Sequence, residues 1–209
     1  DRYTQLAIIS AMQGVKDAGF DLEKENLNRI GVVYGVGIGG IKTFEDEVTS
    51  YATRREEGPK FNPFFIPKMI ADIASGQISM LYGFHGPNYT TTSACASSTN
   101  ALADAFNLIR LGKADVMISG GAEAAICECG VGGFNALHAL STRNDDPEHA
   151  SRPFSASRDG FVMGEGAACI VLEELEHAKA RGAKIYAEMV GEGASADAHH
   201  ITASHPEGL

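Results

Sequence analysis

The chain has 209 residues, 44% of them hydrophobic, which is enough for one large core or about one and a half average domains. Its formal net charge is -10, and this excess of acid argues against nucleic acid or an anionic membrane surface as the main partner. The four cysteines, the absence of an apolar N-terminal run and the absence of an apolar stretch of about 18 residues predict a cytoplasmic protein that does not enter a membrane.

Strands and helices are expected to alternate along the chain, with no repeat or linker between them. The first part of the chain is expected to form a helix from about Arg2 to Ala18 closed by Gly19, a strand at Ile30–Tyr34, a helix starting near Lys42, an irregular loop at Gly58–Pro67 and a helix from about Lys68 to Tyr82 ended by Gly83. A strand leading into Cys95, a helix that stops at Gly112 and a buried strand at Ala114–Ser119 are expected next. The remaining expected elements are a short helix to Leu140, a polar loop at Ser141–Gly160, and strands at Ala167–Glu173 and Ile185–Val190 separated by a helix at Leu175–Arg181. Such alternation predicts an α/β layered domain.

The segment Asn88–Gly121, NYTTTSACASSTNALADAFNLIRLGKADVMISGG, is the most informative part of the chain. A β-branched run leads into small residues around Cys95, and Ser97 with the polar residues after it offers N-cap chemistry to a helix. Unpaired N–H groups and the helix dipole at such a junction favour a thiolate over a thiol. Cys95 is therefore the candidate nucleophile. The alternative is a small buried cysteine that fills a gap.

Two further motifs suggest other chemistry. Gly35, Gly37 and Gly40 satisfy G-x-G-x-x-G between a strand and a helix, so a dinucleotide-binding domain is a remote alternative. Its context fails, because GPKFNPFFIP stands where a second strand ending in Asp or Glu should follow. Cys127 and Cys129 form a C-x-C pair without a second pair or a histidine at ligand spacing, so no metal is expected.

The segment TTTSACASSTNAL, followed by GKADVMISGGAEA, resembles the nucleophile region of the β-ketoacyl-acyl-carrier-protein synthases, most closely the elongation-type synthase II of the thiolase superfamily. The resemblance extends through NPFFIPKMIADIASGQISMLYGFHGPN on one side and GVGGFNALHALSTRNDDPEHASRPFSASRDGFVMGEGAACIVLEELEHAKARGAKIYAE on the other, and so over essentially the whole chain. It implies a thiolase-like layered fold with a five-stranded mixed sheet between helices.

The resemblance implies an acyltransferase of fatty-acid biosynthesis, a 3-oxoacyl-acyl-carrier-protein synthase. Cys95 would take an acyl group and pass it to a malonyl carrier in a decarboxylative Claisen condensation. The substrates would arrive on the phosphopantetheine of acyl carrier protein, and no cofactor of the enzyme's own is expected. A polyketide-type ketosynthase or a thiolase relative is the alternative. A non-catalytic partner of the chain-length-factor type would lack Cys95.

The resemblance also assigns an acyl pocket and a dimer contact. The expected pocket residues are Ile38, Phe65, Ala125, Gly130 and Phe134. For the glycine-rich loop at Ile38, the alternative is a tight turn that needs glycine for its backbone conformation. For Phe65 and Phe134, the alternative is ordinary packing in the core. The uncharged β-forming run in Asn88–Thr92 predicts an unprotected sheet edge that pairs antiparallel with its copy in a homodimer. An acidic carrier would need a local basic patch, for which the candidates are Arg54, Arg55, Lys60 and Lys68.

Synthases of this type are about twice as long as this chain and carry two catalytic histidines in HGT-like and GHxxGA-like motifs. None of the seven histidines here stands in such a motif. We therefore expect residues 1–209 to be the N-terminal, nucleophile half of a synthase, truncated at both ends and inactive alone.

Overall fold

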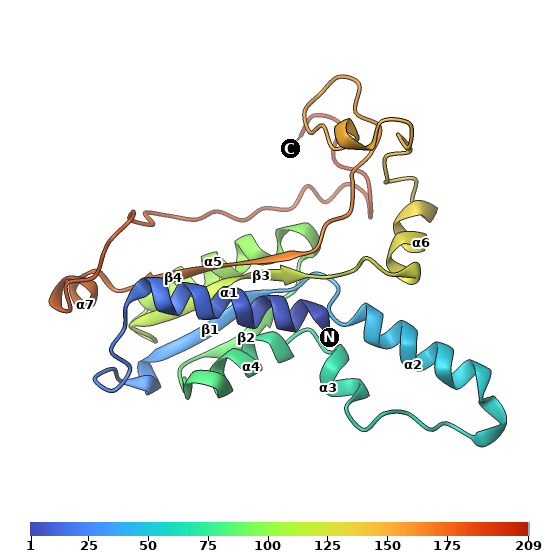
Figure 1. Cartoon of the computed structure of the whole chain (residues 1–209). Helices are drawn as coiled ribbons and strands as arrows, with labels where there is room; N and C mark the ends of the chain where they lie inside the picture. The colour runs from blue at the N-terminus through green and yellow to red at the C-terminus, as the bar shows by residue number, and fades with distance from the viewer. Residues whose placement is uncertain (209) are drawn as a thin grey trace.

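The computed structural model describes residues 1–208 as a layered α/β fold (Figure 1). The helices are α1 (Arg2–Ala18), α2 (Ile41–Thr53), α3 (Phe65–Met69), α4 (Ile73–Tyr82), α5 (Ser97–Arg110), α6 (Glu128–Ala136) and α7 (Leu175–Ala180), and the strands are β1 (Ile30–Gly35), β2 (Asn88–Thr91), β3 (Val116–Glu123) and β4 (Gly166–Glu173). Helix α2 points away from the sheet, and α3 leads back towards it.

The sheet is mixed, with strand order β2-β1-β3-β4. Strand β1 runs parallel to β2 and β3, while β4 is antiparallel to β3. Within residues 1–208 the sheet has four strands, so the expectation of five strands is not met. The predicted strand at Ile185–Val190 is wrong, because this β-forming segment pairs with no strand of the described sheet.

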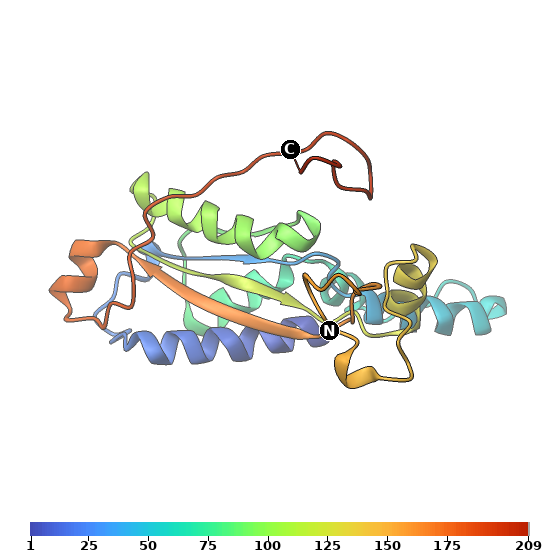
Figure 2. The same ribbon diagram turned by 90° about the horizontal axis from the view of Figure 1, so that it is seen from above.

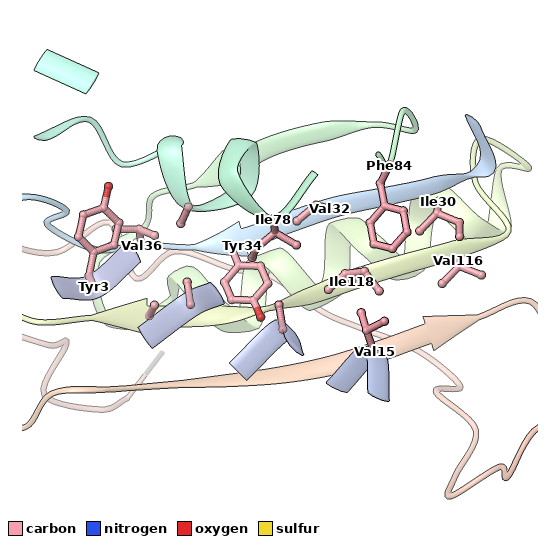
Figure 3. Packing of buried hydrophobic residues seen from close by; sticks show 14 of the residues in the cluster. Tyr3, Val15, Ile30, Val32, Tyr34, Val36, Ile78, Phe84, Val116 and Ile118 are labelled. Atoms are coloured by element: carbon pink, nitrogen blue, oxygen red, sulfur yellow. The ribbon is translucent and has the colours of Figure 1, made fainter. Parts of the chain in front are cut away.

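Helices cover both faces of the sheet, with α5 on one face and α1 on the other (Figure 2). The larger core lies between the sheet, α1 and α4, and its labelled members include Tyr34, Ile78 and Ile118 (Figure 3). Helix α1 contributes buried residues at a spacing of four, namely Tyr3, Ala7, Ala11 and Val15. The smaller core packs Ala101 and Ala105 of α5 against the opposite face. Small side chains on α5 let its axis approach the sheet closely.

The predicted single helix from Lys68 to Tyr82 is divided in two. Ile70 is extended, with φ -65° and ψ 140°, and separates α3 from α4. Two carbonyl groups at this break have tertiary partners, because Met69 O accepts the N–H of Gly40 at 2.9 Å and Ile70 O accepts the hydroxyl of Tyr3 at 2.5 Å. These partners replace the hydrogen bonds that a continuous helix would make. The other predicted helices and the strands before residue 174 are found, with shifts at their ends.

Candidate functional site

The turn between β2 and α5 (Figure 1) carries Cys95 at the carboxyl end of a parallel strand, where α/β sheets place their ligands. Ala94–Ala96 form one turn of 3₁₀ helix, and α5 follows at Ser97. Ala94 has a φ of 50°, in the left-handed region, at a cost of roughly 1–3 kcal/mol. A strained non-glycine residue directly before a candidate nucleophile favours a functional role for this turn.

Buried Ser97 ties the two sides of this turn together. Its Oγ donates to the carbonyl of Ala94 at 2.7 Å and accepts the N–H of Ser93 at 2.9 Å. Asn100 in turn donates to Ser93 Oγ at 2.7 Å. The predicted N-cap role of Ser97 is wrong, because the N-cap position is Ala96, which makes no side-chain cap. The serine instead fixes the backbone around Cys95.

Two glycines allow the first turn of α5 to rest on the sheet. Gly35 of β1 and Gly121 of β3 face each other in register. A Cβ at Gly35 would lie closer than 3.0 Å to backbone atoms of Ser97 and Ser98, and a Cβ at Gly121 would lie 2.5 Å from Ser98 Cβ. Larger residues would therefore push α5, and with it Cys95, away from the sheet.

Cys95 is exposed and its thiol is free. This contradicts the alternative of a buried cysteine that fills a gap. The N–H of Ala96 donates to Ser93 O at 3.1 Å, whereas the N–H of Cys95 has no hydrogen-bond partner within residues 1–208. An unpaired N–H beside the positive end of a helix dipole can stabilise an oxyanion. The geometry thus combines an accessible sulfur with one candidate oxyanion donor.

The other three cysteines are less suited to nucleophilic attack at neutral pH. Burial raises the pKa of Cys169 and, together with the nearby Glu45 carboxylate, that of Cys127. A hydrogen bond to Glu45 raises the pKa of Cys129. A raised pKa lowers the thiolate fraction, and the thiolate is the reactive species. Reaction at these three thiols is therefore disfavoured by their raised pKa values and, for Cys127 and Cys169, also by their lower exposure.

A carboxylate that was not predicted from the sequence binds two backbone amides of the glycine-rich loop after β1. Glu123, at the end of β3, accepts the N–H of Ile38 at 2.8 Å and the N–H of Gly39 at 3.2 Å. In a dinucleotide-binding domain, such amides face a pyrophosphate. Here they already hold an anionic group of the chain itself, which argues against that alternative. The signal available in the sequence was an acidic residue two positions after the Gly120-Gly121 pair, at the end of a buried strand.

The five predicted pocket residues lie on three segments around α2. Ile38 is in the loop after β1 and is 44% exposed. Phe65 begins α3 and packs on Phe44 of α2, with ring centroids 6.3 Å apart. Phe134 of α6 meets Phe161 edge-to-face at 5.2 Å. These aromatic contacts are also those of ordinary packing.

Ala125 and Gly130 are both buried, and they touch each other. A Cβ on Gly130 would overlap the carbonyl oxygen of Ala125, so the glycine is required by backbone contact rather than only by space for a ligand. Two hollows of about 220 and 950 Å³ are lined by other residues, and neither includes Cys95 or the five predicted pocket residues. The acyl-pocket assignment stays a prediction.

Helix α6 is attached to α2 through Glu45. The N–H of Cys129, in the first turn of α6, donates to Glu45 Oε2 at 2.6 Å, and this bond holds the pKa of Glu45 below its ordinary value. A carboxylate at a helix N-terminus is also favoured by the helix dipole. Residues 1–208 contain no group of three or more His, Cys, Asp or Glu side chains placed to hold a metal ion. In the same residues no helix is both long and apolar enough to cross a membrane.

The family model of the beta-ketoacyl synthase N-terminal domain matches residues 1–178. The chain belongs to the beta-ketoacyl synthase family. The 3-oxoacyl-[acyl-carrier-protein] synthase 2 of Staphylococcus aureus is 52% identical over 209 residues, which are 100% of this chain and 51% of the relative. The chain therefore spans about half the length of the curated relatives it matches.

Solved structures of beta-ketoacyl synthases share the fold. A beta-ketoacyl synthase from Burkholderia phymatum STM815 superposes with a TM-score of 0.88 at 36% identity, over 99% of this chain and 50% of that one. The type II polyketide ketosynthase AntDE, in complex with the acyl carrier protein AntF, superposes with a TM-score of 0.78 at 31% identity, over 88% of this chain and 46% of that one. The predicted family and thiolase-like layered fold are confirmed.

Proposed function

We propose that this chain provides the nucleophile of a condensing enzyme of fatty-acid elongation. The observation that carries the proposal is the exposed Cys95 in a strained turn before α5, with its N–H unpaired within residues 1–208. The 52% identity to a 3-oxoacyl-[acyl-carrier-protein] synthase 2 supports this choice of reaction.

In the first step, the Sγ thiolate of Cys95 attacks the thioester carbonyl of an acyl carrier. A bond forms between Sγ and the carbonyl carbon, and the bond from that carbon to the carrier sulfur breaks, so that the carrier leaves as a thiol after taking a proton. The N–H of Cys95 would donate a hydrogen bond to the oxyanion that develops in this step. The fixed turn around Ser97 keeps the sulfur and the N–H on one rigid segment.

In the second step, a malonyl carrier loses CO2, and the resulting carbanion attacks the acyl-Cys95 carbonyl. A carbon–carbon bond forms, the bond to Sγ breaks, and the Cys95 thiolate is regenerated with release of a 3-ketoacyl carrier. The enolate in this step needs stabilising groups. No histidine of this chain stands in the family motifs that supply them, so we propose that condensation requires the full-length protein.

The test is product formation by full-length enzyme carrying Cys95→Ala. The variant should form no acyl-enzyme and at least about 10³-fold less 3-ketoacyl product, since covalent catalysis is lost. Cys127→Ser is the matched control, because it removes a thiol from the same domain that is not proposed to react. A Cys95→Ala enzyme with full condensing rate would refute the proposal.

A polyketide-type ketosynthase is the second candidate, favoured by the structural match to AntDE. Its lower identity of 31%, against 52% for the elongation enzyme, ranks it behind. Mass spectrometry of the products separates the two. Addition of one two-carbon unit per turnover, with extension resuming only on a reduced carrier, supports elongation, whereas repeated extension of an unreduced chain supports polyketide synthesis.

We further propose that the protein acts as a homodimer through the strand Asn88–Thr92. Strand β2 is an edge of the described sheet, and its Tyr89 is 38% exposed. An unpaired edge offers N–H and C=O groups to a second copy. The expected pocket of Ile38, Phe65, Ala125, Gly130 and Phe134 is part of the same proposal.

Acyl carrier protein is the proposed protein partner, as AntF is the partner of AntDE. The four basic candidates are exposed and lie on the arm formed by the end of α2, the following loop and α3, namely Arg54, Arg55, Lys60 and Lys68. These four basic side chains are the proposed contacts for an acidic partner, and Lys60 also lies 3.7 Å from Glu57 of the same arm. The cytoplasmic location expected from the sequence remains part of this proposal.

A further inference from the structure

Glu123 connects the end of β3 with two consecutive amides of the glycine-rich loop. Its Oε2 accepts the N–H of Ile38 at 2.8 Å, and its Oε1 accepts the N–H of Gly39 at 3.2 Å. Both carboxylate oxygens are therefore used, one for each amide. Hydrogen bonds to an ionised group are about twice as strong as those between neutral groups, so the pair holds this loop in one conformation.

The same loop lies against the turn that precedes Cys95. A Cβ built on Gly37 would lie 2.7 Å from Glu123 Oε2 and 3.3 Å from the carbonyl oxygen of Ala94. Gly37 therefore lies close to both the carboxylate and the strained residue next to Cys95. Thr92 Oγ1 adds a second connection, because it donates to the carbonyl of Val36 at 3.0 Å.

We infer that Glu123 is a positioning residue that sets acyl-chain selectivity by fixing Ile38 beside the Cys95 turn. Glu123 contacts neither the sulfur nor any reacting atom. It acts through the loop backbone, whose position determines where the Ile38 side chain stands. The inference rests on the proposed function, because it assigns Ile38 to the acyl pocket.

Glu123→Gln is the sharpest substitution for this inference. Glutamine keeps the size and shape of the side chain, but it has one acceptor oxygen and an NH₂ group that cannot accept a hydrogen bond. One of the two loop amides would therefore face a donor and lose its partner. The loop should become mobile without the creation of a cavity.

The experiment uses the full-length protein and two alkylating probes, iodoacetamide and an N-alkyl iodoacetamide with a twelve-carbon chain. Both react with the Cys95 thiolate, and the ratio of their rate constants reports how well the site accepts a long chain. The ratio does not depend on condensation. We expect Glu123→Gln to change it by at least about threefold, in the same direction as Ile38→Ala, with little change in the iodoacetamide rate.

The double variant Glu123→Gln with Ile38→Ala distinguishes positioning from general destabilisation. If Glu123 acts through Ile38, the double variant should match Ile38→Ala alone, because coupled residues are not additive. A merely structural role would lower the melting temperature and slow both probes equally. Glu174→Gln is the matched control, since Glu174 also accepts a backbone N–H, that of His177 at 2.7 Å, in α7.

Each outcome decides the inference separately from the proposed function. An unchanged probe ratio in Glu123→Gln, or fully additive effects in the double variant, would overturn it. If the wild-type protein makes no 3-ketoacyl product, the proposed function fails. The probe ratio would still show whether Glu123 controls access of long chains to Cys95.

Discussion

Gly121→Ala tests whether the close contact between α5 and the sheet positions Cys95. The added methyl group would lie 2.5 Å from Ser98 Cβ, where ordinary contacts begin at 3.4 Å. The first turn of α5 must therefore withdraw by about 0.9 Å. Neither partner can turn aside, because a Cβ atom is fixed to the backbone.

The expected cost has two parts. Overpacking of this kind destabilises a protein by about 1–3 kcal/mol. A nucleophile misplaced by about 1 Å loses on the order of 10²-fold in rate. We expect full-length Gly121→Ala to unfold at lower urea concentration and to condense about 100-fold more slowly. Gly35→Ala should be worse, because its methyl group would overlap the backbone of Ser97 and Ser98 directly.

The assay compares kcat/KM for condensation with the urea unfolding midpoint of the same variant. Gly76→Ala is the control, because apart from the backbone of α4 and the two adjacent residues no described atom lies within 4 Å of its Cβ position. Alanine there should stabilise the helix by about 0.8–1 kcal/mol and leave condensation unchanged. A folded Gly121→Ala enzyme with wild-type kcat/KM would refute the role given to this contact.

Two further predictions concern pH and assembly. His177 lies 2.6 Å from Glu173 and 3.2 Å from Glu25; burial alone would lower its pKa, but these carboxylates outweigh burial and raise the pKa above 6.5. The ion pairs of His177 should therefore contribute their full stability below pH 6.5 and lose it as pH rises through the raised pKa. Urea unfolding of His177→Gln should show a weaker loss of stability above pH 6.5 than wild type, and a loss equal to that of wild type would contradict this role of His177. Tyr89→Lys places like charges on the β2 edges of the two copies and should raise the dimer dissociation constant about tenfold or more, as measured by sedimentation. Tyr89→Phe is the control, because it loses only the hydrogen bond to Asp104 and should stay dimeric. A Tyr89→Lys dimer as stable as wild type would show that β2 is not the contact.

Local patterns in the sequence predicted the parts of the fold that depend on local chemistry. The junction of β2 and α5 at Cys95 follows from a β-branched run next to a helical pattern, and the structure shows that junction. The position of β2 at an edge of the sheet was also predicted from this run, because it carries no charge or proline. The family motifs gave the layered fold.

Features that depend on distant partners could not be predicted. The break at Ile70 follows from hydrogen bonds to Tyr3 and Gly40, which are far away in sequence. Serine is a typical N-cap residue, but the Ser97 hydroxyl donates to the carbonyl of Ala94, because the strained turn places that carbonyl within its reach. The segment Ile185–Val190 has strand propensity but no strand beside it within residues 1–208. β propensity forms a strand only where a neighbour supplies hydrogen bonds.

The role of Glu123 was also hidden in the sequence. Its two acceptors meet amides 84 and 85 positions earlier in the chain, so no local pattern shows the contact. The same applies to Glu45 of α2, which accepts a backbone N–H from the first turn of α6. From the sequence alone, such acidic residues are interpreted as exposed to solvent, because their backbone partners become known only with the tertiary structure.

The central claim is that Cys95 is the acylated nucleophile, and peptide mass spectrometry after incubation with an acyl carrier substrate tests it most directly. We predict one acyl group per chain of the full-length protein, bound as a thioester to the peptide that contains Cys95, and no adduct in Cys95→Ala. An acyl group on Cys127, Cys129 or Cys169 instead, or turnover without any covalent adduct on Cys95, would contradict it.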